Sequence, residues 1–170
     1  MFSFFKNVTF HATDDNERKH IENSFGNVVP VRTALNLPYH YPFTNPMEKK
    51  VGFLRLLSIS LISPMKNHKL VLESLSLCRE EVVYEIVGAV KDKSYWNECL
   101  SLIEKLPENV KVIYHGEQPP GNLGSFLTNT HLLVMPSKSE NYGHAIVEAL
   151  SAGRPVLTSM QTPWNCLQIQ

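Results

Sequence analysis

The sequence lacks the features that mark nucleic-acid-binding, membrane-spanning and secreted proteins. Its 16 lysines and arginines are balanced by 16 aspartates and glutamates, and no basic cluster with interleaved aromatic residues occurs. No apolar run approaches the length of a transmembrane helix. The opening Met1–Phe5 is apolar but has no basic residue before it and is followed at once by Lys6, so it does not resemble a secretory signal. We expect no nucleic-acid partner and no transmembrane segment, which leaves peripheral contact with a membrane open.

Cysteine is scarce, and its spacing disfavours metal and redox sites. The three cysteines, Cys78, Cys99 and Cys166, form no Cys-x-x-Cys pair, and no cluster of His and Cys has the spacing of metal ligands. Cys78 and Cys99 fall within helical patterns, which favours buried thiols in a reducing compartment. We therefore expect a cytoplasmic protein without a metal site.

Three nucleotide-binding signatures are also missing. Neither Gly-x-Gly-x-x-Gly nor the Walker phosphate loop occurs, which disfavours a nicotinamide enzyme and a P-loop ATPase. There is also no Asp-x-Asp of the kind that holds a divalent ion on a nucleotide sugar. Whatever chemistry the chain performs is expected to need neither a metal nor another cofactor.

The apolar pattern predicts a parallel α/β sheet with helices on both faces. With 43% hydrophobic residues the chain can bury a substantial core. Short apolar runs alternate with helix-period segments, which is typical of a Rossmann-like domain. In the first of these helices we expect Leu70, Val71, Leu75 and Leu77 on or near the buried face. The predicted strands are 53–59, 83–87, 110–114, 132–135 and 155–159, and the predicted helices are 67–77, 95–105, 123–129 and 142–152.

Residues 1–34 carry a smaller strand–helix–strand pattern. The predicted strands are 8–12 and 28–31, and the helix between them stops near Gly26. His11 lies at the end of the first strand. We interpret it as a structural or solvent-facing histidine in preference to a catalytic one.

Residues 35–50 predict an irregular connection between two domains. They contain three prolines and show no apolar periodicity. Tyr39, Tyr41 and Phe43 are expected to pack on the domain that follows, which we place at 51–170.

Chemistry-bearing residues gather where predicted strands end. The loops that contain Lys66, Gly88, Gly116 and Glu140 each follow a strand. In parallel sheets the ligand binds outside the carboxyl ends of the strands, so these four loops are predicted to form one site.

The loop and helix over 136–152 suit a ligand with both phosphate and hydroxyl groups. Glu140 in the loop and Glu148 on the helix would lie about 12 Å apart along the axis, at ~1.5 Å per residue. Between them, the free N–H groups of the helix start near Gly143 and His144 suit an anion such as phosphate. The bland alternative is an ordinary helix with two solvated acids.

A long ordered pattern runs through this region. Pro-Ser-x-x-Glu-Asn-Tyr-Gly-His spans 136–144, Glu148 follows eight positions after the first glutamate, Ala-Gly-x-Pro-Val spans 152–156 and Thr-Pro-Trp spans 162–164. The pattern resembles retaining nucleotide-sugar glycosyltransferases of family four. The resemblance implies the GT-B arrangement of two facing Rossmann-like domains, with this chain supplying mainly the C-terminal, donor-binding one.

The resemblance also implies roles for individual residues. Glu140 would contact the transferred sugar and Glu148 the donor ribose. Tyr142, Gly143 and His144 are carried over as donor-binding residues of the same motif. Neither acid is assigned as a nucleophile, because the family uses the two acids for positioning.

Two further positions follow from the resemblance. Ser63-Pro-Met-Lys66-Asn67 resembles the family's phosphate loop, so Lys66 would neutralise the donor diphosphate and stabilise its departure. The nucleotide base would lie against the loop that begins near His115 and Gly116.

The sequence departs from the family at one cation. The family usually has an arginine shortly before the lysine, near the position of Leu61, and no arginine lies between Ser58 and Lys66. We expect either a compensating residue or weaker donor binding.

The function implied is retaining transfer of a sugar from a nucleoside diphosphate sugar to a sugar, glycan or lipid-linked acceptor, in glycan or polysaccharide biosynthesis. Residues 1–34 would be only a remnant of the acceptor domain, and the family continues beyond Thr-Pro-Trp. We therefore expect a C-terminally incomplete donor domain that binds nucleotide sugar weakly and does not transfer alone. A noncatalytic nucleotide- or partner-binding module and a sugar-nucleotide epimerase of the same architecture remain alternatives.

Overall fold

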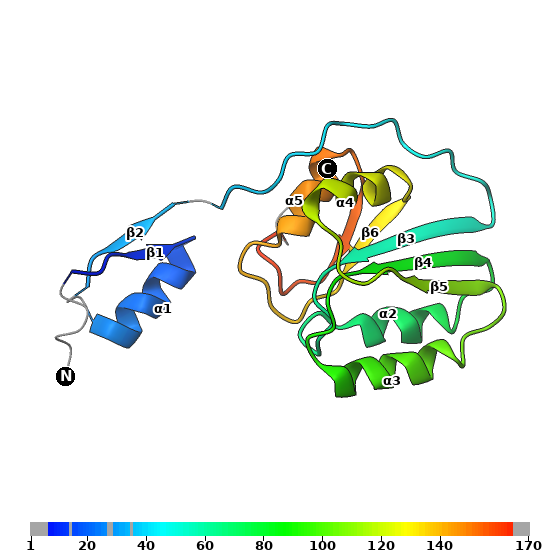
Figure 1. The fold of residues 1–170 in the computed structure, drawn as a ribbon, viewed down its shortest axis with the longest axis horizontal. Helices are drawn as coiled ribbons and strands as arrows, with labels where there is room; N and C mark the ends of the chain where they lie inside the picture. Colours follow the sequence, from blue (N-terminus) through cyan, green and yellow to red (C-terminus); the bar gives the residue numbers. More distant parts are fainter. Residues whose placement is uncertain (1–6, 14, 27–28, 35, 165–170) are drawn as a thin grey trace. The chain divides into compact units, whose positions relative to one another are not determined.

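The computed structural model describes four stretches of the chain, residues 7–13, 15–26, 29–34 and 36–164. The chain divides into two compact units, Met1–Leu37 and Pro38–Gln170, which are described here one at a time (Figure 1).

The first unit contains two short parallel strands and one helix. Strand β1 (Phe10–Ala12) pairs with β2 (Val31–Thr33), and helix α1 (Asp15–Phe25) connects them. The second strand was predicted to begin at residue 28, but β2 begins at Val31. Pro30 has no N–H to donate to a ladder and instead accepts a hydrogen bond from the Phe10 N–H at 2.9 Å, so regular pairing starts after it.

His11 has a structural partner in this unit. Its Nε2 lies 2.8 Å from the carbonyl oxygen of Ala34, just beyond the end of β2. This contact fits the structural interpretation of His11.

The second unit is built on a five-stranded parallel sheet in the order β5-β4-β3-β6-β7. Four helices connect the strands in chain order, and every element predicted from the sequence is present. The strands are β3 (Phe53–Ile59), β4 (Glu81–Val87), β5 (Val110–Tyr114), β6 (Leu132–Met135) and β7 (Val156–Thr158). The helices are α2 (His68–Leu75), α3 (Lys93–Ile103), α4 (Pro120–Thr128) and α5 (His144–Ser151).

The helices cover both faces of this sheet. Going from β3 to β4 to β5 the chain moves toward one edge, and it then returns past β3 to β6 and β7. Because such connections are right-handed, the two directions place helices on opposite faces. Helices α2 and α3 lie along one face and α4 and α5 along the other (Figure 1).

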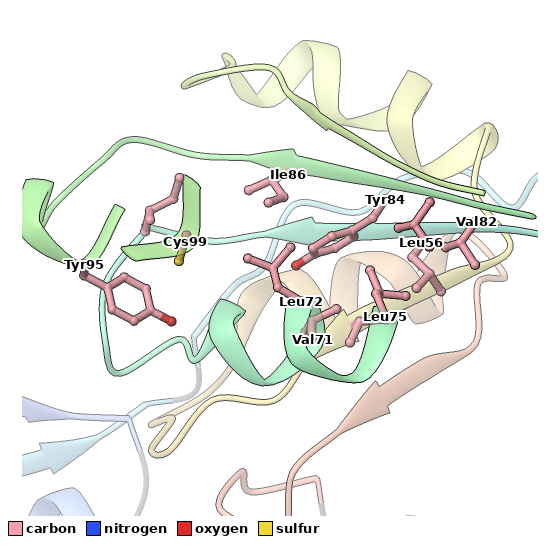
Figure 2. Packing of buried hydrophobic residues seen from close by; sticks show 12 residues of the cluster. Leu56, Val71, Leu72, Leu75, Val82, Tyr84, Ile86, Tyr95 and Cys99 are labelled. Atoms are coloured by element: carbon pink, nitrogen blue, oxygen red, sulfur yellow. The ribbon is translucent and has the colours of Figure 1, made fainter. Parts of the chain in front are cut away.

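Helix α2 turns one row of apolar side chains toward the sheet. Val71, Leu72 and Leu75 point from α2 toward Leu56 and Tyr84 on the sheet (Figure 2).

Two of the leucines expected on this buried face are exposed instead. Leu70 is 47% exposed, because it is turned about 100° from Val71 around the helix axis. Leu77 is 83% exposed because the helix has already ended at Leu75.

Part of the predicted connection packs against the second unit. Residues 38–50 have no regular secondary structure. Tyr41 is buried, as expected, and its hydroxyl donates to the carbonyl of Pro120 at 2.6 Å. Phe43 contacts Gly153 with one side of its ring but is 66% exposed, and Tyr39 is 55% exposed, so of the three aromatic residues only Tyr41 is buried.

A buried arginine fixes the same segment. Arg154 is 2% exposed, and its Nη2 donates to the carbonyls of Thr44 at 2.7 Å and Asn45 at 2.8 Å. Since buried backbone carbonyls need donors, this guanidinium lets an irregular segment lie against the domain.

In the part of the chain that the structure describes, no helix is both long and apolar enough to cross a bilayer.

Candidate functional site

Four loops meet at the carboxyl edge of the sheet through main-chain hydrogen bonds. The Lys138 N–H, in the loop after β6, donates to the Met65 carbonyl at 2.8 Å. This bond joins the loop after β6 to the loop after β3. The loop after β4 is joined to the loop after β5, because Gly88 N–H donates to the Gly116 carbonyl at 2.8 Å. The Ile62 N–H donates to the Ala89 carbonyl at 2.9 Å, which links the loops after β3 and β4, so all four loops predicted from the sequence meet at this edge.

Lys66 and Glu140 form an ion pair at this edge. The Lys66 Nζ donates to Glu140 Oε1, and the same oxygen accepts from the Ser137 hydroxyl at 3.1 Å. The Glu140 side chain is only 11% exposed and that of Lys66 21%. Both residues were predicted for the site from the sequence, but a direct contact between them was not predicted.

Helix α5 begins at His144, four residues after Glu140, and its N-cap residue carries no side chain. Its N-cap is Gly143, which has a φ of 75° and, as a glycine, offers no side-chain cap to the first turn. A glycine suits this left-handed conformation, and a side chain there would also press against Ile146. The first N–H groups of α5 are thus left without a cap, as an anion-binding helix start requires.

The ring of Tyr142, which precedes the N-cap Gly143, has two aromatic neighbours. The Tyr142 ring lies 5.0 Å from that of His144 and 5.8 Å from that of Trp164. The Trp164 indole N–H donates to the Tyr142 carbonyl. Tyr142 and His144 were predicted for the site, whereas Trp164 was noted only as part of a motif.

Glu148 lies apart from the Lys66–Glu140 pair, on the body of α5. Burial raises the pKa of its carboxyl group, while the charge of His144 and the main-chain N–H of Tyr39 act in the opposite direction. Its surroundings include the segment that carries Tyr39 and Tyr41. The structure does not bring the two predicted acids into one ion-pair network.

A second buried carboxylate lies under the Gly116 loop. Glu85 on β4 accepts from Arg55 Nη2 at 3.0 Å and is bonded to His115 Nε2 at 2.9 Å. The Glu85 side chain is 8% exposed. The network holds His115 immediately before Gly116, and the only sequence signal for it was a glutamate inside an otherwise apolar strand.

His68 lies at the beginning of α2, close behind Lys66. It is 1% exposed, its Nε2 lies 3.3 Å from the Ser60 hydroxyl, and its Nδ1 has no hydrogen-bond partner. Burial and the nearby charge of Lys66 lower the pKa of His68 to about 4. The contact between His68 and Ser60 joins the first residue of α2 to the first residue of the loop after β3.

Titration of His68 predicts a loss of stability in mild acid. Its pKa is about 4 when folded, against about 6.5 when unfolded, so the unfolded chain binds more protons between these values. The free energy of unfolding is therefore fully maintained above about pH 6.5 and is lost as the pH falls toward 4. From pH 7.5 to 5.0 we expect a loss of about 2 kcal/mol from this group, measured by urea unfolding.

The variant His68→Gln isolates this contribution. Glutamine can still reach the Ser60 hydroxyl but does not titrate, so its unfolding free energy should fall less over the same pH interval. Glu148, whose raised pKa gives a slope of opposite sign, is present in both proteins and cancels in the difference. Equal slopes in the two proteins would contradict the assignment.

No group of three or more His, Cys, Asp or Glu side chains within the described stretches is arranged to hold a metal ion.

Comparison with known proteins adds to this geometry. Residues 45–169 match the family described as glycosyl transferases group 1. The chain belongs to this family. A comparison with curated proteins gave no match.

Solved structures with the GT-B fold resemble this glycosyl transferase group 1 chain. Alr3699/HepE from Anabaena, crystallised with UDP and glucose, has a TM-score of 0.72 at 18% identity, and the match covers 94% of this chain and 46% of that one. The lipopolysaccharide outer core galactosyltransferase WaaB has a TM-score of 0.68 at 19% identity, covering 94% and 45%. Sucrose-phosphate synthase from Thermosynechococcus elongatus has a TM-score of 0.71 at 16% identity, covering 95% and 43%. These matches confirm the predicted fold, and the chain spans less than half the length of each.

Proposed function

We propose that this chain binds the donor of a retaining glycosyltransferase, which moves a sugar from a nucleoside diphosphate sugar to a sugar, glycan or lipid-linked acceptor in glycan or polysaccharide biosynthesis. The observation that carries the proposal is the Lys66–Glu140 pair, together with an uncapped start of α5 four residues after Glu140. A cation, an acid and open helix N–H groups at one sheet edge suit a ligand that is both a diphosphate and a polyol.

Each side chain has a role that follows from its chemistry. Lys66 and the first N–H groups of α5 would hold the diphosphate and stabilise the negative charge that develops as it leaves. Glu140 would orient hydroxyl groups of the transferred sugar. Glu148 would take the ribose hydroxyls, and the main chain near Gly116 the base. Tyr142, Gly143 and His144 shape the helix start.

The mechanism that we propose needs no metal ion, and Lys66 and the first N–H groups of α5 would supply the positive charge at the diphosphate. We infer that Lys138 supplies the second cation, which the sequence lacks near Leu61. Its main-chain N–H is bonded to Met65, next to Lys66, and its side chain is exposed with no ion-pair partner in the described stretches.

The compartment that we propose is the cytoplasm, where the free thiols of Cys78 and Cys99 would stay reduced. Contact with the inner face of a membrane would accompany a lipid-linked acceptor.

Isothermal titration calorimetry with the full chain tests the donor-binding proposal. The Anabaena protein was crystallised with UDP-glucose, so UDP and UDP-glucose are the first probes, with GDP and ADP as alternative bases. We expect at least one nucleoside diphosphate to bind with a Kd between about 10 µM and 1 mM, an ordinary substrate affinity. The matching monophosphate should bind about tenfold more weakly, since it loses one charge-assisted contact.

The titration either contradicts the donor-binding proposal or leads to a second experiment. If none of the diphosphates binds, the proposal fails. If one binds, incubation with radiolabelled donor separates the remaining classes, because transfer, epimerisation and simple binding leave different labelled products.

A further inference from the structure

The segment after β7 crosses the loop that carries Glu140. The Ser159 hydroxyl donates to the Ser137 carbonyl, and the Trp164 indole N–H donates to the Tyr142 carbonyl. Ser137 and Tyr142 stand on either side of Glu140 in the sequence. We call residues 159–164 the strap.

The strap is itself held in one conformation. Thr162 is 3% exposed, and its hydroxyl lies 3.2 Å from the Ser159 carbonyl and 3.3 Å from the Thr158 hydroxyl. The Thr158 hydroxyl in turn donates to the Met135 carbonyl at 3.0 Å, at the end of β6. The strap is therefore fastened to the same strand end from which the Glu140 loop departs.

The far end of the strap is packed as well as hydrogen-bonded. Trp164 lies against the hydrophobic cluster between the sheet and α4 and α5. Its ring meets that of Tyr142 edge to face at an angle of 75°. Edge-to-face rings and an N–H bond to the same residue fix the backbone just before Gly143.

These contacts act on Glu140 through a short series of bonds. The Ser159 hydroxyl donates to the Ser137 carbonyl, and the Ser137 hydroxyl donates to the Glu140 carboxylate. The same carboxylate accepts from the Lys66 ammonium group. Movement of this backbone by a fraction of an ångström would change the geometry of the ion pair.

We propose that Ser159 and Trp164 are positioning residues, which hold Glu140 and Lys66 in the arrangement that binds the sugar and diphosphate of the donor. The inference rests on the proposed function. It assigns a role to the Thr-Pro-Trp segment without placing either residue on the ligand.

Calorimetric titration of the full chain with UDP-glucose tests this inference. Trp164→Phe keeps an aromatic ring and loses the N–H, so we expect a five- to tenfold weaker Kd, the value of one hydrogen bond. Trp96→Phe is the matched control, since the Trp96 ring is half-buried under α3, lies 4.8 Å from that of Tyr114 at a tilt of 50°, and has no hydrogen bond to the Glu140 loop in the described stretches. Ser159→Ala should behave like Trp164→Phe, and Ser159→Thr, which keeps the hydroxyl, should restore binding.

A double-variant cycle separates positioning from a merely structural role. If Trp164 acts through Glu140, Trp164→Phe should have little further effect on the Kd in a Glu140→Gln background. Additive losses, or a Trp164→Phe protein that binds as the Trp96→Phe control does, would overturn the inference. If the unaltered chain binds none of the diphosphates, the proposed function itself fails and the inference fails with it.

Discussion

Replacing Lys66 by methionine should weaken binding of the preferred nucleoside diphosphate by about 10- to 100-fold, because hydrogen bonds between charged groups contribute about 1.5–3 kcal/mol. Methionine keeps most of the length of the unbranched side chain and removes the charge and its donors. The effect should appear in calorimetry as a raised Kd, with a smaller loss for the monophosphate. Lys138→Met, which removes the second cation that we propose, should cost less than Lys66→Met.

The same substitution should also destabilise the protein. It leaves Glu140, 11% exposed, without its cation, and an unpaired carboxylate in partly buried surroundings costs about 1–2 kcal/mol after allowance for solvent screening. Adding Glu140→Gln should recover that stability, because the neutral amide no longer needs a cation. It should not recover diphosphate binding. The double variant thus separates the role of the pair in folding from its role in the site.

Lys69→Met is the matched control for both measurements. Lys69 pairs with Glu98 at 2.7 Å, but both side chains are substantially exposed, at 34% and 54%. Exposed ion pairs contribute little to stability because solvent screens them, so this variant should keep nearly all its stability and all of its diphosphate affinity. Lys66→Met behaving like Lys69→Met in the binding experiment would remove the main support for the donor site.

The sheet was predictable because strands such as β4 and β6 are largely buried on both faces. A strand such as Leu132–Met135 is apolar along its whole length, and a run of this kind between turn residues is distinctive in a sequence. The α5 region was predictable for a different reason. Its glutamates, glycine and proline stand in a fixed order that resembles a known family.

Contacts between distant residues could not be read from the sequence. The Lys66–Glu140 pair joins residues 74 positions apart, and Arg154 reaches Thr44 across 110 positions. Neither leaves a periodic pattern, since each depends on how loops fold over the edge of the sheet. Trp164 shows the same limit, because a tryptophan after a strand carries no sign of which carbonyl its N–H will meet.

Helix boundaries were missed where proline or solvent decides them. Helix α4 begins at Pro120, three residues before the predicted start, because proline is well tolerated in the first turn of a helix. Glu85 was missed because a glutamate in an apolar strand has no sequence signal that distinguishes a buried, paired carboxylate from an exposed one.

The substitution Gly88→Ala should cause the largest loss of stability, because Gly88 lies against the main chain of Ser60 at the edge of the site. This residue has a φ of 145°, and an added Cβ would lie 2.0 Å from the Ser60 carbonyl oxygen. Ser60 cannot move aside easily, because its N–H donates to the Val87 carbonyl at 3.0 Å. We expect Gly88→Ala to cost more than about 3 kcal/mol of unfolding free energy, since backbone strain and a main-chain clash act together.

Two other glycines give the scale against which this loss is measured. Gly116 also has a positive φ, of 68°, but open space around it, so Gly116→Ala should cost only about 1 kcal/mol. Gly121 lies in the first turn of α4 with nothing within 4 Å, and Gly121→Ala should gain about 0.5 kcal/mol from helix propensity. Urea unfolding of the three variants should therefore rank Gly121→Ala above Gly116→Ala, and Gly116→Ala well above Gly88→Ala. If Gly88→Ala is too unstable to purify, Gly88→Ala fused to a solubility partner should show no cooperative transition. A Gly88→Ala protein as stable as Gly116→Ala would mean that the loops after β3 and β4 do not approach as closely as described, and the edge on which Lys66 lies would then be less rigid than the site requires.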